Sequence, residues 1–342
     1  MSTFGNRVDT TVQTSYLPYV VDTVLNSNVL FQRTVRAAKA EKWSGRKKIV
    51  PIKISKNSTG QSFAGFDAFS TSATDNRVNM EFNPKFYQIT CALPGDELSV
   101  ADTDEKVLDL MKLTIQSDSE DMADDLGTIM YQDGTGNSGK DPLGLKALVD
   151  DGTTVATYGG LSRATYTTIK STVTASGGTL TLAGMDALHA AVTSGSQKPT
   201  LWVTTETVFN LYGQLLRPQE RISKDVSAMR GADLIGGTGF TGLMFNGKPV
   251  VADEKCTSGY MYALNENYIN FYSCPFWNAK SIAYKNQIKG NDYESPLGLG
   301  FSWSDWIIPA NQGAVIGHMY FGGEFINTNP KRSGVITGVT GI

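Results

Sequence analysis

The clearest periodic pattern in the chain lies between Asp104 and Tyr131. Apolar residues recur there in steps of three, four or seven, which places them on one face of an α-helix. At 1.5 Å per residue, this helix is roughly 40 Å long. The apolar face is formed by Leu108, Met111, Ile115, Met122, Leu126 and Ile129.

Two upstream segments alternate between apolar and polar residues, which is typical of β-strands. They are Arg46–Ile54 and Arg77–Cys91, and they predict a long hairpin in which Pro84 marks an edge or a bulge. The loop between them, Ser55–Asn76, has about twenty residues, and such loops in compact domains are normally functional or disordered. It contains three aromatic residues, Phe63, Phe66 and Phe69. These indicate either a contact surface or a mobile loop whose aromatic residues are incidental.

The segment from Lys198 to Tyr272 mixes helix and strand signals. The apolar run Leu201–Val203 predicts a strand, and Thr204-Thr205 can cap the amphipathic helix that follows. Asn246-Gly247 predicts a tight turn, because both residues tolerate positive φ. A second short helix is predicted over Thr181–Val192, capped by Thr181. Further strands are predicted at Leu243–Phe245, Val250–Ala252, Tyr260–Leu264 and Tyr268–Tyr272.

The two ends of the chain carry weaker patterns. Residues Met1 to Lys42 have too few apolar positions for a core of their own, and we expect them to lie on another surface. Residues Phe276 to Asn327 return to strand-like, aromatic sequence, which we expect to pack along the long helix. The polar, glycine-rich tail Lys331–Ile342 is expected to be loosely held.

Composition narrows the class of protein. The chain has 342 residues, is 40% hydrophobic and 18% charged, and contains 35 glycines, which favours strands, turns and surface buried against other chains. Its formal net charge of -3 gives no basic character for nucleic-acid binding. Without a signal peptide, the three cysteines (Cys91, Cys256 and Cys274) indicate folding in a reducing cytoplasm. No apolar run approaches the roughly 18 residues of a membrane span.

The long predicted helix concentrates negative charge. Residues Asp102–Asp125 hold nine acids and two bases, a net charge of -7, so the rest of the chain carries +4. These acids could be metal ligands, but no cluster of His or Cys accompanies them. We therefore interpret them as a solvated face and expect no metal.

Other motifs give no support for catalysis or for a cofactor. Gly134 to Lys140 formally matches GxxxxGK, but it follows a helix and precedes Pro142, so a phosphate loop is not expected. Gly237 to Gly242 matches GxGxxG, but strand-like residues follow it where a helix should begin. The two histidines, His189 and His318, lie in no known catalytic motif. A hydrolase that uses only carboxylates remains an open alternative.

Three phrases resemble the major capsid proteins of tailed bacteriophages, which share the Hong Kong ninety-seven fold. They read DPLGLKALV, YGGLSRATY and FNGKPVVAD…GYMYALNENYINFY, and the order of elements over most of the chain agrees. The resemblance implies an α+β fold with an N-terminal arm, an extended β-hairpin loop, a peripheral domain with a long spine helix, and an axial α/β domain. The implied ranges are 1–42 for the arm, 43–92 for the hairpin, 93–140 with 276–330 for the peripheral domain, 141–275 for the axial domain, and 331–342 for the tail.

The resemblance also implies contacts between subunits. The extended loop, with Lys56, Phe63, Phe66 and Phe69, is expected to lie across an adjacent subunit. Some relatives join this loop to a neighbour by a lysine–asparagine bond, and Lys53 and Lys56 lie near the right place, but no matching asparagine is evident, so we expect no cross-link. A second loop is expected at the local symmetry axis and carries the charged residues Arg217, Glu220, Arg221, Lys224, Asp225 and Arg230.

The function implied is a shell protein that forms hexamers and pentamers around the double-stranded DNA genome of a tailed phage. The expected partners are other copies, a portal and a separate scaffolding protein, since no room for a cleavable domain precedes the first strand. The shell would be assembled in the bacterial cytoplasm and form part of the virion, without a membrane. DNA would be enclosed without strong binding, because the basic residues outside the long helix are few. The alternative is a bacterial nanocompartment shell that encloses cargo protein.

Overall fold

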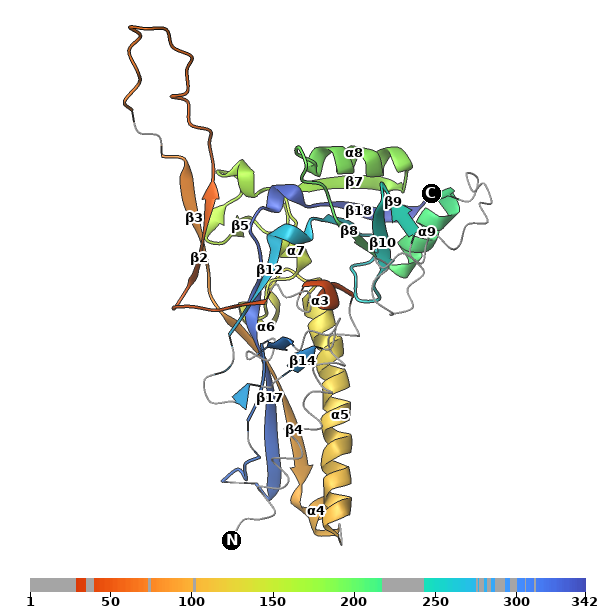
Figure 1. Ribbon diagram of the computed structural model, residues 1–342. Helices are drawn as coiled ribbons and strands as arrows, with labels where there is room; N and C mark the ends of the chain where they lie inside the picture. The colour runs from red at the N-terminus through yellow and green to blue at the C-terminus, as the bar shows by residue number, and fades with distance from the viewer. Residues whose placement is uncertain are drawn as a thin grey trace.

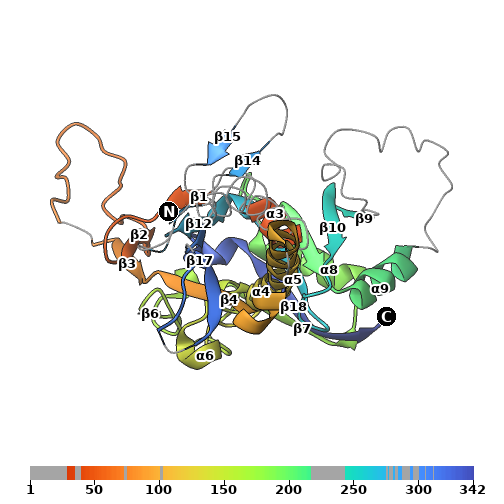
Figure 2. The ribbon, with the colours of Figure 1, turned by 90° about the horizontal axis from the view of Figure 1, so that it is seen from below.

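The computed structural model shows an elongated molecule in which a hairpin, a long helix with its sheet, and a compact α/β unit point in different directions (Figure 1). Viewed along the long helix, the hairpin and the α/β unit lie on opposite sides of it (Figure 2). The structure describes residues 29–34, 40–72, 75–100, 103–216, 243–274, 276, 280–281, 284–286, 293–295, 300–304, 306–310 and 312–342.

The predicted long helix is confirmed as α5 (Asp104–Ile129). It lies beside strand β4 (Lys85–Pro94), which pairs in antiparallel fashion with the 14-residue strand β17 (Ala314–Asn327). The large apolar side chains buried toward the core recur every four or seven positions, so one face of the helix is apolar. They are Met111, Ile115, Met122, Leu126 and Met130.

Strand β17 also organises the rest of the peripheral sheet. The strand order is β1 (Ala40–Lys42), β12 (Ile269–Ser273), β17, β16 (Phe301–Trp303) and β13 (Lys280–Ser281), with β4 pairing β17 off this path. Aromatic rings fill its core, with Phe271 stacked on Phe321 at 5.3 Å between ring centroids. The pairing places β4 and β12 in this sheet. The expected boundaries at residues 92 and 275 therefore do not coincide with the sheets.

The extended hairpin is formed by β2 (Lys48–Lys53) and β3 (Arg77–Phe82). As the alternation predicts, one face is buried and the other is exposed. The buried side chains are Val50, Ile52, Met80 and Phe82. Pro84 lies in the break between β3 and β4, as predicted from its missing N–H.

The axial sheet has the order β7 (Thr172–Thr179), β18 (Gly334–Gly341), β11 (Met261–Leu264), β8 (Leu201–Thr204), β10 (Lys248–Ala252) and β9 (Leu243–Phe245). Both predicted helices of this region are present, α8 (Leu182–Val192) and α9 (Glu206–Leu216). The Thr181 hydroxyl accepts a hydrogen bond from the Gly184 N–H at 3.0 Å, as a helix cap should. Asn246 and Gly247 have φ values of 48° and 73°, which confirms the tight turn.

The short elements connect these units. The GxxxxGK segment forms a turn in which Asn137 and Ser138 have positive φ, and it is not the start of a phosphate-binding helix. The short elements not yet described are α3 (Val29–Thr34), α4 (Gly95–Val100), α6 (Gly136–Gly139), α7 (Leu145–Leu148), β5 (Thr157–Tyr158), β6 (Leu161–Ser162), η2 (Thr167–Ile169), η6 (Glu266–Tyr268), β14 (Tyr284–Asn286), β15 (Tyr293–Ser295) and η8 (Pro330–Arg332).

The expectation of a loosely held C-terminal tail is wrong. Residues Gly334–Gly341 form β18, which pairs with β7 on one side and β11 on the other. Val335, Ile336 and Val339 are buried. Gly334 lies in close packing, because a Cβ there would lie 2.7 Å from Leu188 Cδ1 and 3.0 Å from the Thr172 carbonyl oxygen. Gly334, one of the glycines that suggested mobility, thus lets the strand lie against helix α8.

A buried ion pair orders the connection from α5 to the axial sheet. Arg163 Nη1 lies 3.0 Å from Asp150 Oδ2, and Nη2 donates to the Ala147 carbonyl at 2.6 Å. Asp150 also accepts backbone hydrogen bonds from Gly152 and Val155. Because both charges are buried, these hydrogen bonds replace the lost water and fix the path of the chain.

Helix α3, which lies within the expected arm, packs on the body of the molecule. Val29 and Leu30 are buried, and their N–H groups bond to the Asp253 carboxylate. Arg33 makes a bidentate pair with Glu266, with N–O distances of 2.5 and 2.9 Å. The expectation that Met1–Lys42 lies on another surface can be followed only for residues 29–34 and 40–42, which pack on their own chain, because residues 1–28 and 35–39 lie outside the described residues.

We predict that Ile336→Ala lowers the free energy of unfolding by about 2–4 kcal/mol, because it leaves a cavity beside β11 and α8. Urea unfolding of the purified protein would measure this loss. Thr340→Ala on the same strand is the control, since Thr340 is exposed, and it should cost at most about 1 kcal/mol. Equal small losses in both variants would show that β18 is not part of the folded core.

Candidate interaction surfaces

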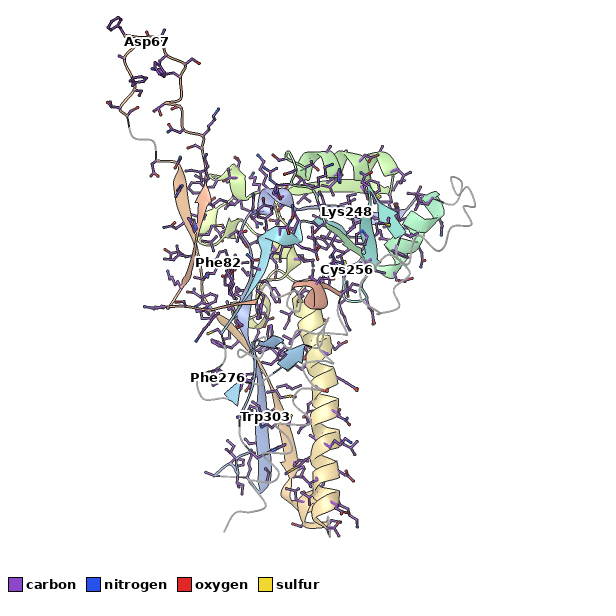
Figure 3. The ribbon with its side chains drawn as sticks, viewed as in Figure 1. Asp67, Phe82, Lys248, Cys256, Phe276 and Trp303 are labelled. Atoms are coloured by element: carbon purple, nitrogen blue, oxygen red, sulfur yellow. The ribbon has the colours of Figure 1, made fainter. Side chains whose placement is uncertain are left out.

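The tip of the extended loop is the most exposed apolar feature of the described chain. Relative exposures are 65% for Phe63, 106% for Phe66 and 61% for Phe69. The loop leaves the hairpin and stands away from the body, with Asp67 labelled near its tip (Figure 3). Phe63 and Phe69 meet edge to face at 5.1 Å between ring centroids. Exposed aromatic clusters of this kind are typical of surfaces that bind another molecule.

Local hydrogen bonds give the tip a defined shape. The Asp67 carboxylate accepts from the Ala64 N–H at 2.8 Å, and the Asp67 N–H donates to the Ala64 carbonyl at 3.1 Å. Gln61 Nε2 donates to the Ala68 carbonyl at 2.9 Å. The rings are therefore presented on a turn closed by its own polar groups.

The stem of the loop is basic. Lys53, Lys56 and Arg77 are exposed, and among the described residues no carboxylate lies within 4.0 Å of their charged nitrogens. Lys47 is paired with Glu81 at 2.6 Å. The loop therefore combines an apolar tip with a stem that carries unpaired positive charge.

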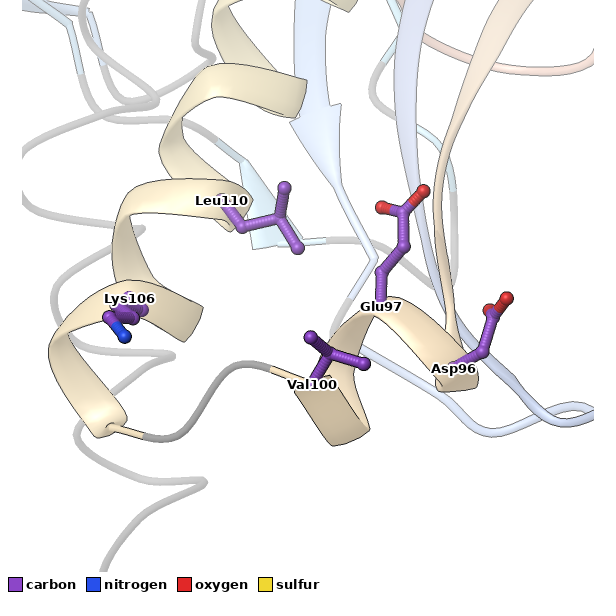
Figure 4. A pocket seen from close by; sticks show the side chains of 5 residues that line it. All are labelled: Asp96, Glu97, Val100, Lys106 and Leu110. Carbon is purple, nitrogen blue, oxygen red and sulfur yellow. The ribbon is translucent and has the colours of Figure 1, made fainter.

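A groove lies at the other end of the molecule, where α4 meets the start of α5 (Figure 4). It encloses about 440 Å³ and is lined by Asp96, Glu97, Val100, Lys106 and Leu110. Val100 is 80% exposed, and the nearby helix residue Leu113 is 63% exposed. The loop tip of the same chain cannot reach this groove, because the two lie at opposite ends of the molecule (Figure 1).

The acidic face of α5 is solvent-exposed, as predicted. Its exposed acids are Glu105, Asp109, Glu120, Asp121, Asp124 and Asp125. Lys255 pairs with Asp124, and the Tyr87 hydroxyl donates to Asp125. Among the residues described, no three His, Cys, Asp or Glu side chains are grouped to hold a metal ion. The acids instead form a charged surface along the helix, and of those named only Glu105 and Asp109 lie near the groove.

One acid of α5 faces inward. Burial raises the pKa of Asp118, and a hydrogen bond with the Cys91 thiol partly opposes that rise. Burial also raises the pKa of the Cys91 thiol well above its usual range. A protonated, buried thiol is a poor nucleophile, so this pair acts as packing between α5 and β4.

The two histidines do not meet. His189 lies on α8 beside Phe245, with 6.3 Å between ring centroids, and its pKa is lowered by burial and by Lys198. His318 lies on β17 and bonds to the Thr90 hydroxyl at 2.9 Å. His189 is on a helix that packs on the axial sheet and His318 is on a strand of the peripheral sheet, which agrees with their interpretation as structural residues.

The predicted contact residues differ in outcome. The structure brings Phe63 and Phe69 together and leaves Lys56 and Phe66 exposed on the same loop. The axial-loop residues Arg217, Glu220, Arg221, Lys224, Asp225 and Arg230 lie outside the described residues. Sequence reasoning missed the groove, although Leu113 falls off the inward stripe of α5 and could have indicated a second apolar surface.

The fold has solved relatives. The chain is similar to the capsid asymmetric unit of cyanophage A-1(L), with a TM-score of 0.61 and 17% identity over 88% of this chain and 90% of that one. It is similar to the capsid of Myoviridae phage XM1, with a TM-score of 0.52 and 14% identity over 89% and 91% of the two chains. It is also similar to the SrpI encapsulin of Synechococcus elongatus, with a TM-score of 0.51 and 10% identity over 89% and 86%.

At these identities the likeness establishes the fold, which is the one shared by phage capsids and encapsulins. The expected α+β Hong Kong ninety-seven fold is thereby confirmed. No protein-family model and no curated protein matches the sequence. Within the described residues no helix is long and apolar enough to cross a membrane.

We predict that trypsin cuts the free subunit after Lys56, because the exposed loop backbone lies outside the β2–β3 ladder there. Peptide mass spectrometry at early times would identify the bond. Lys56→Gln should remove this cut while circular dichroism stays unchanged. Resistance of the Lys56 bond in the wild-type subunit would show that the loop is covered within one copy.

Proposed function

We propose that the protein is the major capsid protein of a tailed bacteriophage, which assembles into an icosahedral shell around double-stranded DNA. The observation that carries this proposal is a capsid fold with three exposed phenylalanines on a loop that stands off from its own subunit. One copy cannot bury this surface, so another copy is the partner that fits it. In this proposal the shell is part of the virion and is assembled in the bacterial cytoplasm.

The two ends of the molecule support repeated contact between copies. The loop offers aromatic rings and unpaired bases, and the far end offers an apolar groove beside acids of α4 and α5. The loop of one copy is thus complementary to the groove region of another, because aromatic rings can meet apolar surface and bases can meet acids. A contact between different patches is heterologous, and such contacts build rings when the rotation closes.

The rings proposed are hexamers and pentamers. The loop that contains Arg217, Glu220, Arg221, Lys224, Asp225 and Arg230 is proposed to meet its copies at the ring axis, where mixed charges can pair. A portal and a separate scaffolding protein are the further partners proposed. Each contact can be weak, because many contacts act together in a closed shell.

We further propose that the shell encloses DNA without binding it strongly. Strong phosphate binding needs many lysines and arginines on one surface, and the chain has a formal net charge of -3. Several of its bases are engaged within the subunit, among them Arg33, Arg163 and Lys255. DNA that is not gripped can slide as it is packaged.

The alternative is a nanocompartment that encloses cargo protein. It is favoured by the similarity to the SrpI encapsulin, whose TM-score of 0.51 is close to the 0.52 of the XM1 capsid. The fold therefore does not distinguish the two functions. The contents of the particle, DNA or cargo protein, would distinguish them.

The test is to express the protein with its neighbouring genes and to examine purified particles by negative-stain microscopy. Closed particles that carry nuclease-protected DNA would support the capsid function. Closed particles that retain a bound protein and no DNA would support the nanocompartment. A monodisperse monomer at high concentration, with scaffold supplied, would contradict both.

We predict that changing Phe63, Phe66 and Phe69 together to Ser prevents assembly while the subunit stays soluble and folded. Each ring that is buried on a neighbour contributes on the order of 1–3 kcal/mol, and the loss is repeated at every subunit. Sedimentation would measure the assembled fraction, and Ser62→Ala in the same loop is the matched control. Normal particles from the triple variant would show that the three phenylalanines are not needed for contact between copies.

We predict that particle stability falls as salt rises, because unpaired bases of the loop face acids of a neighbour in this proposal. Thermal dissociation of empty shells at low and at high salt would measure this change in stability.

Submicromolar, salt-sensitive binding of duplex DNA by the subunit or by the empty shell would contradict the proposal that the shell encloses DNA without binding it strongly.

A further inference from the structure

A buried acid lies where the peripheral sheet meets the connection to the axial domain. Glu324 on β17 is 1% exposed. Its Oε1 accepts a hydrogen bond from the Leu143 N–H at 2.6 Å and from the Phe325 N–H at 3.3 Å. The preceding residue, Gly323, pairs with Lys85, the first residue of β4. Glu324 therefore lies just beyond the end of the β17–β4 ladder, where it has no partner residue in β4. Its carboxylate accepts a hydrogen bond from the Leu143 segment instead.

That segment is also fixed to the end of the spine helix α5. The Leu145 N–H donates to the Met130 carbonyl at 2.6 Å. A Cβ on Gly144 would lie 2.4 Å from the Ile129 carbonyl oxygen, so the two backbones are in close contact. Residues 143–145 thus join the helix to β17, and Glu324 holds the β17 side of this joint.

A cation holds the turn immediately before the joint. Lys85 Nζ donates a hydrogen bond to the Gly139 carbonyl. The turn is strained, since Asn137 and Ser138 have φ values of 49° and 60°. A strained turn needs such ties to persist, and its conformation is sensitive to the loss of one.

The same lysine acts on Glu324. Burial raises the pKa of Glu324 to about 8, while the backbone bond from Leu143 and the charge of Lys85 act in the opposite direction. The described titratable groups packed beside Glu324 include Tyr158 from β5 and Tyr272 from β12, whose pKa values are both raised by burial. The turn itself carries Asp141, whose carboxylate lies against Gly136, and Asp133, whose pKa is lowered by its hydrogen bond with Thr135. Arg163 lies over the Tyr158 ring at 5.0 Å and is held by Asp150. Near neutral pH, Glu324 is therefore the group of this set that can change charge.

We propose that Glu324 and Lys85 form a proton-controlled clamp on the joint between the spine helix and the axial domain. With Glu324 protonated, Lys85 bonds Gly139 and the turn is held. When the proton passes to solvent, the buried carboxylate draws the Lys85 ammonium toward it. Gly139 then loses its donor, and the turn over residues 133–143 loosens.

The sign of the linkage follows from the raised pKa. Between the ordinary glutamate pKa and about 8, the folded state keeps a proton that the unfolded state releases. Stability from this group is complete at acid pH and is lost as pH rises toward 8. One proton changes the unfolding equilibrium constant by up to about tenfold per pH unit.

The experiment uses the full chain as free subunit, at pH 6, 7, 8 and 9, so it does not depend on shell formation. Urea unfolding would be measured for wild type, Glu324→Gln and Lys85→Met, together with amide exchange of the 133–145 peptide, corrected for the intrinsic effect of pH. Wild type should lose stability with pH relative to Glu324→Gln, and its peptide should exchange severalfold faster above pH 8. Glu324→Gln should show neither change.

Lys85→Met keeps the test decisive if Glu324→Gln does not fold. It should expose the 133–145 peptide already at pH 6 and move the stability transition to higher pH, because the cation that favours the carboxylate is gone. Lys56→Met on the extended loop is the matched control and should behave as wild type. Equal pH profiles in wild type and Glu324→Gln, or a Lys85→Met peptide protected as in wild type at pH 6, would overturn the proposal.

Discussion

The subunit depends on the antiparallel ladder between β17 and β4. This ladder runs from Ala314 to Gly323 and supports the apolar face of α5. Strand β17 continues beyond it, and its residues Gly323–Asn327 pair with β12. One strand therefore belongs to both the spine region and the approach to the axial domain. Because the backbone hydrogen bonds of a ladder are made along its whole length, the spine is stiff and its two ends keep a fixed separation.

Local signals in the sequence predicted the elements well, because they depend on neighbours in the chain. The stripe of α5, the alternation of β2 and β3, and the positive φ of Asn246 and Gly247 are all properties of a few adjacent residues. The position of β18 could not be found in this way. Its glycine-rich segment becomes a central strand because β7 and β11 pair with it, and both lie far away in sequence. The three phenylalanines could be recognised from composition, whereas the groove could not, because Val100 and Leu110 meet only when α4 turns back toward α5.

Buried and half-buried polar groups lie at the joints of the molecule. Arg163 and Asp150 fix the chain between α5 and the axial sheet, Arg33 and Glu266 fix the arm helix, and Glu324 fixes the Leu143 segment. A buried charge pair contributes little net stability but penalises any arrangement that leaves one partner alone. These groups therefore specify how the units connect, while the aromatic and aliphatic cores provide the driving force for folding.

The location of the Glu324 joint gives small movements a large effect. Helix α5 has 26 residues, so its far end lies roughly 39 Å from the joint at 1.5 Å per residue. The groove between α4 and α5 lies at that far end, and the axial domain begins on the other side of the joint. A rotation of a few degrees at residues 143–145 would move the groove by a few ångströms relative to the axial sheet. In a shell built from contacts at both places, the angle at this joint would decide which neighbours a subunit can reach together. The strained turn and the buried carboxyl thus lie at the end of α5 where a small rotation causes the largest displacement of the groove.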